Sequence, residues 1–319
     1  MKFVVAGAGA IGAYIGARLA QAGCDVTLFA RGPHCRAMQA SGVRVKTAEG
    51  DFEARPRVVD SLEAAGRAGV VFLGVKAHSL PALAPQLGVM FGPGTAVVSM
   101  QNGVPWWYFS GAERLEKVDP GGAIAAAIER RRVIGSIVYL STEIVEPGVV
   151  RHMEGNRITL GEPDGTRSDR CREISEALVQ AGLRAPITTH IRQEIWVKLL
   201  GNIAFNPISA LTGATLVRMA QDPEVSALVR AMMAETEAVA RKLGIDMPIS
   251  IEQRMAGAAK VGEHKTSMLQ DLESGRPLEL EAIVGAVLEL GTRLGVLMPS
   301  TQAVYACTKL LEKQRRGLQ

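Results

Sequence analysis

Lys198, Asn202 and Asn206 are the residues whose types and spacing point most directly to chemistry. They stand four residues apart, so in a helix they share one face. The apolar stripe of that helix is separate and consists of Ile195, Leu199 and Ile203. One ammonium group and two amides suit the binding of a polar substrate and the protonation of a nascent alkoxide. Asparagine lowers helix propensity, which favours a functional reason for both.

A plainer interpretation of Lys198 also stays open. Glu194 stands four residues before it, and a Glu–Lys pair at that spacing is a common ion pair on a helix surface.

Two further polar residues follow predicted strands. Lys76 comes just after the apolar run 69–75, and Asn102 follows the run 94–99. Side chains at the carboxyl ends of parallel strands face the ligand crevice of an α/β sheet. Asn102 with Gly103 is equally typical of an ordinary turn.

A third candidate region lies near the end of the chain, where Ser267 and Asp271 fall on one helix face. Pro277 is then predicted to open a new helix, with Glu279 in its first turn. A carboxylate is favoured there by the helix dipole, which is the purely structural explanation of Glu279.

A glycine-rich turn opens the chain and predicts a dinucleotide site. An apolar strand, Lys2–Ala6, runs directly into a turn, and a helical pattern predicted over Ala13–Ala22 follows. The residues of the turn are Gly7, Ala8, Gly9, Ala10, Ile11 and Gly12. The first glycine permits the tight turn, the second lets a pyrophosphate approach the backbone, and the third lets helix and strand pack closely.

The residue after the second predicted strand indicates which dinucleotide. NAD-binding turns usually place an acid at the end of that strand, here Asp25–Phe29. This chain has Arg31 beside that place, and a guanidinium binds a 2′-phosphate that a carboxylate would repel. The sequence therefore predicts NADPH, although Arg31 is also read as a surface residue that opens a loop.

Composition excludes several classes of protein. The 319 residues are 47% hydrophobic and 21% charged, with a net charge of +4, so neither disorder nor nucleic-acid binding is expected. The densest basic run, Arg130–Arg132, is interpreted as a solvated surface that could attract an anion. No membrane span and no signal peptide are predicted. Four scattered cysteines predict reduced thiols, no metal site and a cytoplasmic location.

The order of elements predicts two domains of different texture. Residues 1–188 alternate strands and helices, as in an α/β Rossmann-type doubly wound sheet that binds NADP, with antiparallel strands of 133–160 at its far edge. Residues 189–319 are predicted to form an all-α domain for substrate and catalysis, with helices at 191–206, 223–243, 249–260 and 278–294. A cleft between the two is the expected substrate site. Apolar helix faces leave a homodimer open.

Taken together, these segments resemble the ketopantoate reductase (2-dehydropantoate 2-reductase) family. The resemblance rests on GAGAIG, Ala30-Arg31-Gly32, VKAHS, QNG, WVKLLGNIAFNPISAL and SMLQDLESGRPLELEAIVG, in the right order over nearly the whole chain. It implies an NADPH-dependent reduction of an α-keto acid, ketopantoate, to a 2-hydroxy acid in pantothenate biosynthesis.

The resemblance also implies roles for individual residues. Lys198 matches the proton donor, and Glu279 matches a carboxylate near the nicotinamide and the lysine. Asn202, Asn206 and Ser267 match substrate-binding residues. Asn102 matches a residue that touches cofactor and substrate, while Arg31 and Lys76 match NADPH contacts.

Some positions depart from the family pattern. A family asparagine would fall near Thr215 or Leu216, an Asn-Gly pair is replaced by Val284-Gly285, and the segment 104–135 is longer. Three alternatives follow: a reductase of another α-keto acid, a related dehydrogenase that oxidises a β-hydroxy acid, and a non-catalytic NADPH sensor.

Overall fold

The computed structural model describes residues 1–111 and 113–317. The chain forms two compact units. We call Met1–Gln101 with Gly121–Ile191 the sheet unit, and Asn102–Pro120 with Arg192–Gln319 the helical unit. The last two residues of the predicted second domain, 318 and 319, lie outside the described residues.

The sheet unit is built on one mixed sheet. Within the described residues its strands are β1 (Lys2–Ala6), β2 (Asp25–Phe29), β3 (Val43–Lys46), β4 (Phe52–Ala54), β5 (Arg57–Val59), β6 (Ala68–Leu73), β7 (Phe91–Ser99), β8 (Val133–Glu146) and β9 (Val149–Gly161). Their order is β4-β3-β9-β8-β7-β6-β1-β2-β5. Neighbours from β5 to β8 pair in parallel, β8 with β9 and β3 with β4 antiparallel, and β9 with β3 in parallel.

The sheet confirms the predicted α/β class and corrects one detail. The strands predicted over 133–160 are antiparallel, as expected, but they do not lie at the edge. β3 pairs with β9 and carries β4 outside it, because β3 continues the sheet through pairs such as Arg44 with Val149. The short strands β3 and β4 carry a weaker sequence signal than the long apolar runs.

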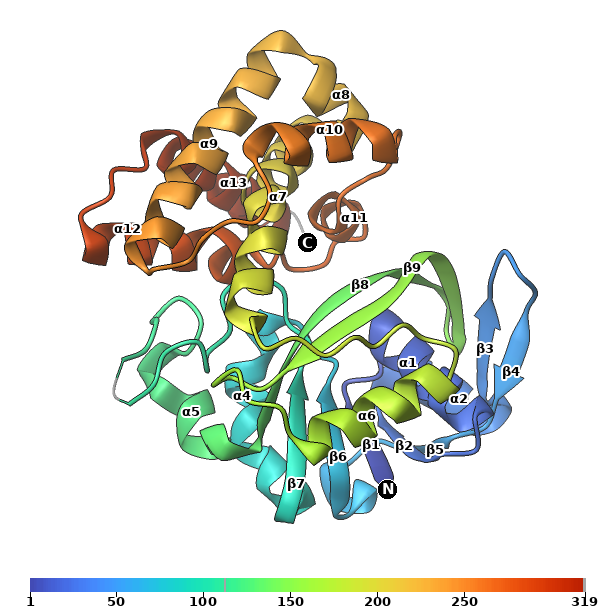
Figure 1. The fold of residues 1–319 in the computed structure, drawn as a ribbon. Helices are drawn as coiled ribbons and strands as arrows, with labels where there is room; N and C mark the ends of the chain where they lie inside the picture. The colour runs from blue at the N-terminus through green and yellow to red at the C-terminus, as the bar shows by residue number, and fades with distance from the viewer. Residues whose placement is uncertain (112, 318–319) are drawn as a thin grey trace. The chain divides into compact units, whose positions relative to one another are not determined.

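Helices of the sheet unit flank these strands (Figure 1). They are α1 (Ala10–Gln21), α2 (Gly32–Ser41), α3 (Leu62–Ala65), α4 (Leu80–Leu83), α5 (Ala123–Ala127) and α6 (Asp169–Gln180). α1 begins three residues earlier than predicted, directly after Gly9. The helix predicted near Ser79 is a 3₁₀ turn, Ala77–Ser79, that leads into the single turn of α4.

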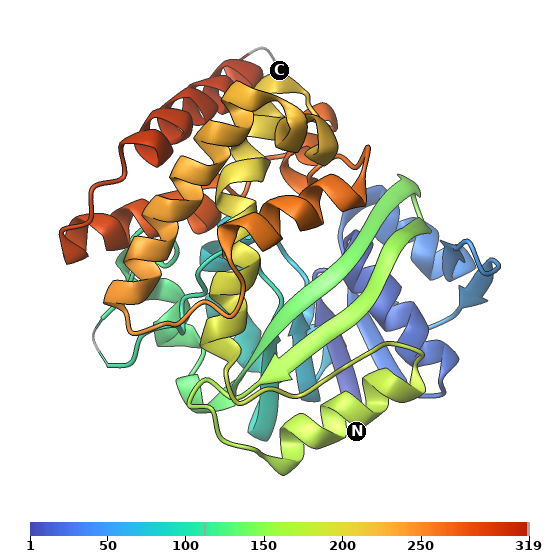
Figure 2. The ribbon, with the colours of Figure 1, turned by 45° about the horizontal axis from the view of Figure 1, so that its top comes forward.

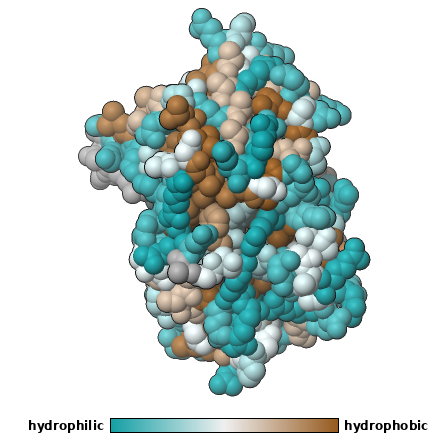
Figure 3. All heavy atoms as spheres, turned by 60° about the vertical axis from the view of Figure 1, so that its left-hand side comes forward, coloured by the Kyte–Doolittle hydropathy of each residue, from teal (hydrophilic) through white to brown (hydrophobic). Residues whose placement is uncertain are grey.

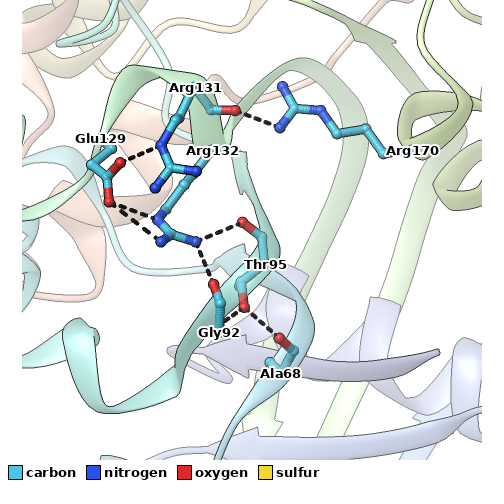
Figure 4. A network of polar contacts seen from close by, with 7 residues as sticks. All are labelled: Ala68, Gly92, Thr95, Glu129, Arg131, Arg132 and Arg170. Carbon is cyan, nitrogen blue, oxygen red and sulfur yellow. Dashed lines mark hydrogen bonds and ion pairs between the residues drawn. The ribbon is translucent and has the colours of Figure 1, made fainter.

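The basic run Arg130–Arg132 is not simply solvated, because Arg132 is buried. Its Nη1 donates to the carbonyl oxygens of Gly92 (2.6 Å) and Thr95 (3.4 Å), and the Thr95 hydroxyl donates to Ala68 (2.6 Å) (Figure 4). Glu129 neutralises the guanidinium. Arg132 therefore satisfies backbone carbonyls where the β6–β7 register shifts, between Ala68 and Val70.

The helical unit contains the longer helices. They are α7 (Ile191–Thr212, of which Ile191 belongs to the sheet unit), α8 (Leu216–Gln221), α9 (Pro223–Lys242), α10 (Ile251–Val261), α11 (Ser267–Glu273), a π-helical turn (Glu281–Gly285), α12 (Ala286–Leu294) and α13 (Pro299–Gly317). Within this unit α7 runs through the middle, with α9, α10 and α13 around it (Figure 2). α13 was not predicted, and the Glu235 carboxylate on α9 caps its start by accepting from the amides of Ser300 and Thr301 (both 2.9 Å).

The segment 102–120 packs in the helical unit although it precedes residue 188. The indole Nε1 of Trp196, on α7, donates to the Tyr108 hydroxyl (2.7 Å), and both side chains are buried. Burial raises the pKa of Tyr108, so it stays a neutral phenol. This gives the aromatic part of the 104–135 segment a packing role. Among the described residues, no helix is long and apolar enough to cross a membrane.

Candidate active site

Three of the predicted site residues form one hydrogen-bonded chain in the helical unit. The Lys198 ammonium, on α7, donates to Asn102 Oδ1 at 2.8 Å. Asn102 Nδ2 in turn donates to Glu279 Oε2 at 3.1 Å. Residues separated by 96 and 177 positions are therefore connected through one amide. Glu279 is buried, with 6% of its surface exposed, while Lys198 and Asn102 are half-buried.

This chain fixes the orientation of the Asn102 amide. An ammonium group only donates hydrogen bonds and a carboxylate only accepts them. The amide must therefore present its oxygen to Lys198 and its nitrogen to Glu279, because the flipped orientation would place like groups together. The arrangement couples the Lys198 charge to the Glu279 charge and holds both side chains still.

Backbone contacts of the same loop bring Asn102 to Glu279. Val104 N donates to the Ala282 carbonyl oxygen at 3.0 Å. The preceding residue, Gly103, has φ +89°, and a Cβ there would lie 2.1 Å from the same Ala282 oxygen. Only glycine fits both the backbone conformation and the space. The QNG turn is thus required for its shape as well as for its asparagine.

The sequence predicted Glu279 in the first turn of a helix, but in the structure this residue precedes the helix. The helix begins at Leu280, one residue later, and continues directly as the π-helical turn Glu281–Gly285. Pro277 does not open it, since 276–279 are not helical. The buried side chain of Glu279 is explained by its bond to Asn102, and short π-helical turns are frequent at functional sites.

Glu281 anchors this π-helical turn to α13. Its carboxylate accepts from Lys309 Nζ (2.7 Å) and the Tyr305 hydroxyl (2.8 Å), and Lys117 Nζ lies at 3.4 Å. Burial acts to raise the pKa of Glu281, but the bonds from Lys309 and Tyr305 outweigh it and lower the pKa. The bond to Glu281 raises the pKa of Lys309. This cluster stays charged and fixes the segment that carries Glu279.

The environment of Lys198 tunes its acidity. Burial, which disfavours an ammonium ion, is the largest influence and lowers the pKa from 10.5 to about 8. The Glu279 charge opposes this change, and the Arg254 charge adds to it. A pKa near neutrality suits a group that must give up a proton during a reaction.

The other polar residues of α7 extend the site along the helix. Asn202 is half-buried, and Asn206 is 4% exposed. Asn206 Nδ2 is buried with no hydrogen-bond partner among the described residues. Such a donor is costly unless a ligand satisfies it, so Asn206 suits a binding role. The Glu194–Lys198 ion pair was the plainer interpretation of the lysine, and the structure shows that Lys198 also bonds Asn102 in the site.

Ser267 lies apart from this chain of contacts. It is the first residue of α11, where Thr266 caps the helix, and its side chain is exposed. Asp271, one turn later, is buried and pairs with Arg276 (3.0 Å). The face of α11 that Ser267 and Asp271 share is therefore exposed at Ser267 and buried at Asp271.

Arg254, on α10, was missed by the sequence reasoning. A Cβ on Gly201 would lie 2.2 Å from Arg254 Nη2, 2.3 Å from Nε and 2.5 Å from Cζ. Gly201 thus leaves room for a guanidinium against α7, three residues beyond Lys198. A glycine inside a long helix costs about 1 kcal/mol relative to alanine, and this was the available signal.

The glycine-rich turn of the sheet unit has the shape that a dinucleotide needs. Gly7 has φ +104°, and Gly12 packs so closely that a Cβ would lie 2.5 Å from the Gly7 carbonyl oxygen. At Gly9, in contrast, nothing lies within 4 Å of a Cβ position. The turn is therefore tight where strand and helix meet and open where a phosphate would approach. α1 starts here without a side-chain cap and without an acid in its first turn, which suits an anion.

The two basic candidates of the sheet unit follow β2 and β6, the strands on either side of β1. Arg31 is exposed and occupies the N-cap position of α2, after β2. Lys76 is half-buried and follows β6. Both come after the carboxyl ends of parallel strands, as predicted from the sequence. In the part of the chain that the structure describes, no group of three or more His, Cys, Asp or Glu side chains could hold a metal ion.

Family models match both halves of the chain. The model described as ketopantoate reductase PanE/ApbA matches residues 3–165, and that for the C terminal of ketopantoate reductase PanE/ApbA matches residues 190–312.

Individual relatives are similar to this chain over nearly its full length. A 2-dehydropantoate 2-reductase of Mesorhizobium japonicum is 49% identical over 99% of both chains. A solved structure of a ketopantoate reductase candidate from Ralstonia solanacearum has a TM-score of 0.93 at 40% identity and covers 98% of both chains. The 2-dehydropantoate 2-reductase of Methylococcus capsulatus has a TM-score of 0.85 at 31% identity, over 99% of this chain and 98% of that one.

Proposed function

The chain belongs to the ketopantoate reductase family, and from that premise we propose that it reduces 2-dehydropantoate (ketopantoate) to pantoate with NADPH, in pantothenate biosynthesis. The observation that carries the proposal is the Lys198–Asn102–Glu279 chain. It holds an ammonium group of lowered pKa in place, which is what protonation of a reduced carbonyl oxygen requires.

We propose Lys198 as the proton donor. Its ammonium group hydrogen-bonds the keto oxygen and transfers a proton to it as negative charge develops. Glu279 acts through Asn102: the carboxylate orients the amide, and the amide oxygen orients the ammonium. After the transfer the neutral amine regains a proton from water, so the site returns to its starting state.

The cofactor residues are proposed from the shape and charge of the sheet unit. Bound NADPH supplies the hydride that the keto carbon accepts. The turn Gly7-Ala8-Gly9-Ala10-Ile11-Gly12 would hold the pyrophosphate beside the open position at Gly9. Arg31 would bind the 2′-phosphate, Lys76 would contact NADPH, and Asn102 and Glu279 would lie near the nicotinamide. The choice of NADPH over NADH depends on Arg31.

The substrate residues are proposed from α7 and α11. Asn202 and Asn206 would bind the substrate beside Lys198, and the unpartnered Asn206 Nδ2 supports this role most directly. Asn102 would contact the substrate as well as the cofactor. Ser267 is exposed, so its hydroxyl is accessible to a ligand.

The test is NADPH oxidation by the purified protein, followed by absorbance, across a panel of 2-oxo acids that includes ketopantoate. We expect ketopantoate to have the highest kcat/KM. Lys198→Ala should lower kcat by about 100-fold or more, because general acid catalysis contributes on that order. The matched control is Lys260→Ala, an exposed lysine on α10, which should keep wild-type activity.

Each alternative gives a different result in the same assay. Preference for another 2-oxo acid would keep the reaction and change the substrate. Faster NADP⁺ reduction with a β-hydroxy acid would indicate the dehydrogenase. Tight NADPH binding with no accelerated oxidation by any acid would indicate a sensor and overturn the proposed function.

We also propose a division of the chain into two domains with different roles. We propose residues 1–188 as the NADP-binding domain and 189–319 as the catalytic domain, with 102–120 packed in the helical unit. The partner is a small α-keto acid, and the proposed location is the cytoplasm. A homodimer is a separate proposal, supported by the large apolar side chains that the helical unit exposes, Leu297 (87%) and Leu310 (58%). The molar mass in solution, against 33.9 kDa for one chain, decides it.

A further inference from the structure

We propose that Arg254 binds the carboxylate of the substrate, so that the site selects 2-oxo acids whose carboxylate is free. This inference rests on the proposed reductase function and adds a specificity-determining residue to it. Arg254 lies on α10, outside the sequence motifs that predicted the site.

The Arg254 guanidinium lies against α7. Three of its atoms lie within 2.5 Å of the position that a Gly201 Cβ would occupy. Gly201 is one residue before Asn202 and three after Lys198, and side chains three apart are neighbours on a helix. The guanidinium is therefore packed against α7 directly beside the face that carries Lys198 and Asn202.

The glycine at position 201 leaves space for this side chain at a cost in helix propensity. With any residue that carries a Cβ at position 201, the guanidinium would have to move from its place against α7. A glycine at this interior position costs about 1 kcal/mol relative to alanine. Other arginines of the helical unit form ion pairs at its surface. Arg230, for example, pairs with Glu252 of α10 at 2.8 Å at the surface.

An unsatisfied hydrogen-bond donor also lies on the Lys198 face of α7. Asn206 is 4% exposed, and its Nδ2 has no hydrogen-bond partner among the described residues. It is four residues beyond Asn202 and thus continues the face that Arg254 adjoins. Donors on this helix face and a guanidinium beside it together suit an acceptor-rich, negatively charged ligand.

A 2-oxo acid carries two hydrogen-bond acceptor groups side by side. Its keto oxygen and its carboxylate stand on adjacent carbons, so one molecule presents both groups to two neighbouring cations. Lys198 must bind the keto oxygen to protonate it, which leaves the carboxylate for Arg254. The planar guanidinium matches a carboxylate with two parallel hydrogen bonds. Arg254 also acts on the Lys198 charge, since it contributes to the lowered pKa of that lysine.

The experiment compares Arg254→Gln, Arg254→Lys and the control Arg230→Gln with the wild type. For ketopantoate, Arg254→Gln should raise KM about 10- to 100-fold, the loss expected for a charged hydrogen-bonded pair. Arg254→Lys should fall between the two, because it keeps the charge without the fork. Removing the positive charge should also raise the pKa of Lys198 seen in the kcat/KM profile, but an effect of Arg254 on Lys198 alone would not raise KM. Arg230→Gln and the Kd for NADPH should be unchanged.

A binding measurement separates this inference from the proposed function. Oxamate carries a carboxylate beside a carbonyl group and is not reduced, so its Kd can be measured by calorimetry in the presence of NADP⁺. We expect the wild type and Arg230→Gln to bind it and Arg254→Gln to bind at least tenfold more weakly.

The outcomes are distinct. If the wild type reduces no 2-oxo acid but binds oxamate through Arg254, the carboxylate site stands and the proposed function falls. If the wild type is active and Arg254→Gln keeps its KM, its oxamate affinity and its pH profile, the inference is wrong. If Arg254→Gln does not fold, the test is made with Arg254→Lys. A wild-type KM and a wild-type oxamate affinity in that variant would overturn the proposed pair of hydrogen bonds from the guanidinium to the carboxylate.

Discussion

At the scale of single residues, the site depends on how Lys198 is held. Its ammonium donates to Asn102, whose amide is oriented by the buried Glu279 carboxylate. Burial and Arg254 make the ammonium easier to deprotonate, while Glu279 keeps it charged. These opposing influences leave the pKa at about 8. The group is therefore protonated at neutral pH and still acidic enough to give up its proton.

The pH dependence follows from this value. As the proton donor, Lys198 must be charged, so kcat/KM for reduction should be level below pH 8 and should fall about tenfold per unit above it. The fall would begin well below 10.5, the ordinary value for lysine. The measurement is kcat/KM for ketopantoate at saturating NADPH across this range. A rate that rises through pH 8 would make Lys198 a base in this direction and would contradict the assignment.

At the scale of elements, two short irregular segments bring the site residues together. The loop that begins at Asn102 docks on the π-helical turn through Val104 N and the Ala282 oxygen. The turn is fixed from its other side by Glu281, which bonds Tyr305 and Lys309 of α13. The long helix α7 places Lys198 within hydrogen-bond distance of Asn102. The regular helices α7 and α13 hold the site in place, and the two irregular segments bring Asn102 to Glu279.

Gly103→Ala tests the docking of the loop. A Cβ would lie 2.1 Å from the Ala282 oxygen at φ +89°, so we expect a loss of about 2 kcal/mol or more in the free energy of unfolding and a lower kcat. The control is Gly213→Ala, where φ is +72° but nothing lies within 4 Å of the Cβ position. It carries only the conformational cost. Thermal unfolding and ketopantoate kinetics measure both, and equal effects of the two variants would show that the close approach is unimportant.

At the scale of the whole molecule, the chain divides its chemistry between two units. The sheet unit carries the glycine turn, Arg31 and Lys76, and the helical unit carries Asn102, Lys198, Arg254 and Glu279. Cofactor choice therefore depends on the sheet unit alone in our proposal. Figure 3 shows one side of the surface, on which hydrophilic side chains surround a cluster of hydrophobic ones in the upper half of the view.

Arg31→Ala tests the cofactor choice. Loss of a guanidinium–phosphate pair should raise the KM for NADPH about 10- to 100-fold and leave that for NADH nearly unchanged. NADPH should also stabilise the wild type against heat more than NADH at equal concentration, because stabilisation follows the ratio of ligand concentration to Kd. Arg57→Ala, an exposed arginine at the start of β5, is the control. Equal losses for the two cofactors would remove Arg31 from the 2′-phosphate site.

The sequence by itself determined the features that repeat at regular intervals. Alternating strands and helices predicted the sheet, the helical period placed Lys198, Asn202 and Asn206 on one face, and glycine spacing predicted the dinucleotide turn. Such patterns depend on residues a few positions apart, which local geometry relates directly.

Only the tertiary structure decided what depends on residues far apart in the chain. It connected Asn102, Lys198 and Glu279 by hydrogen bonds. It also showed that the helix after Glu279 begins at Leu280, and that Arg254 packs against Gly201. It also buried Arg132, which the sequence had placed at the surface. No local pattern encodes these contacts, because packing between distant elements, and not periodicity, selects the partner of a buried charge.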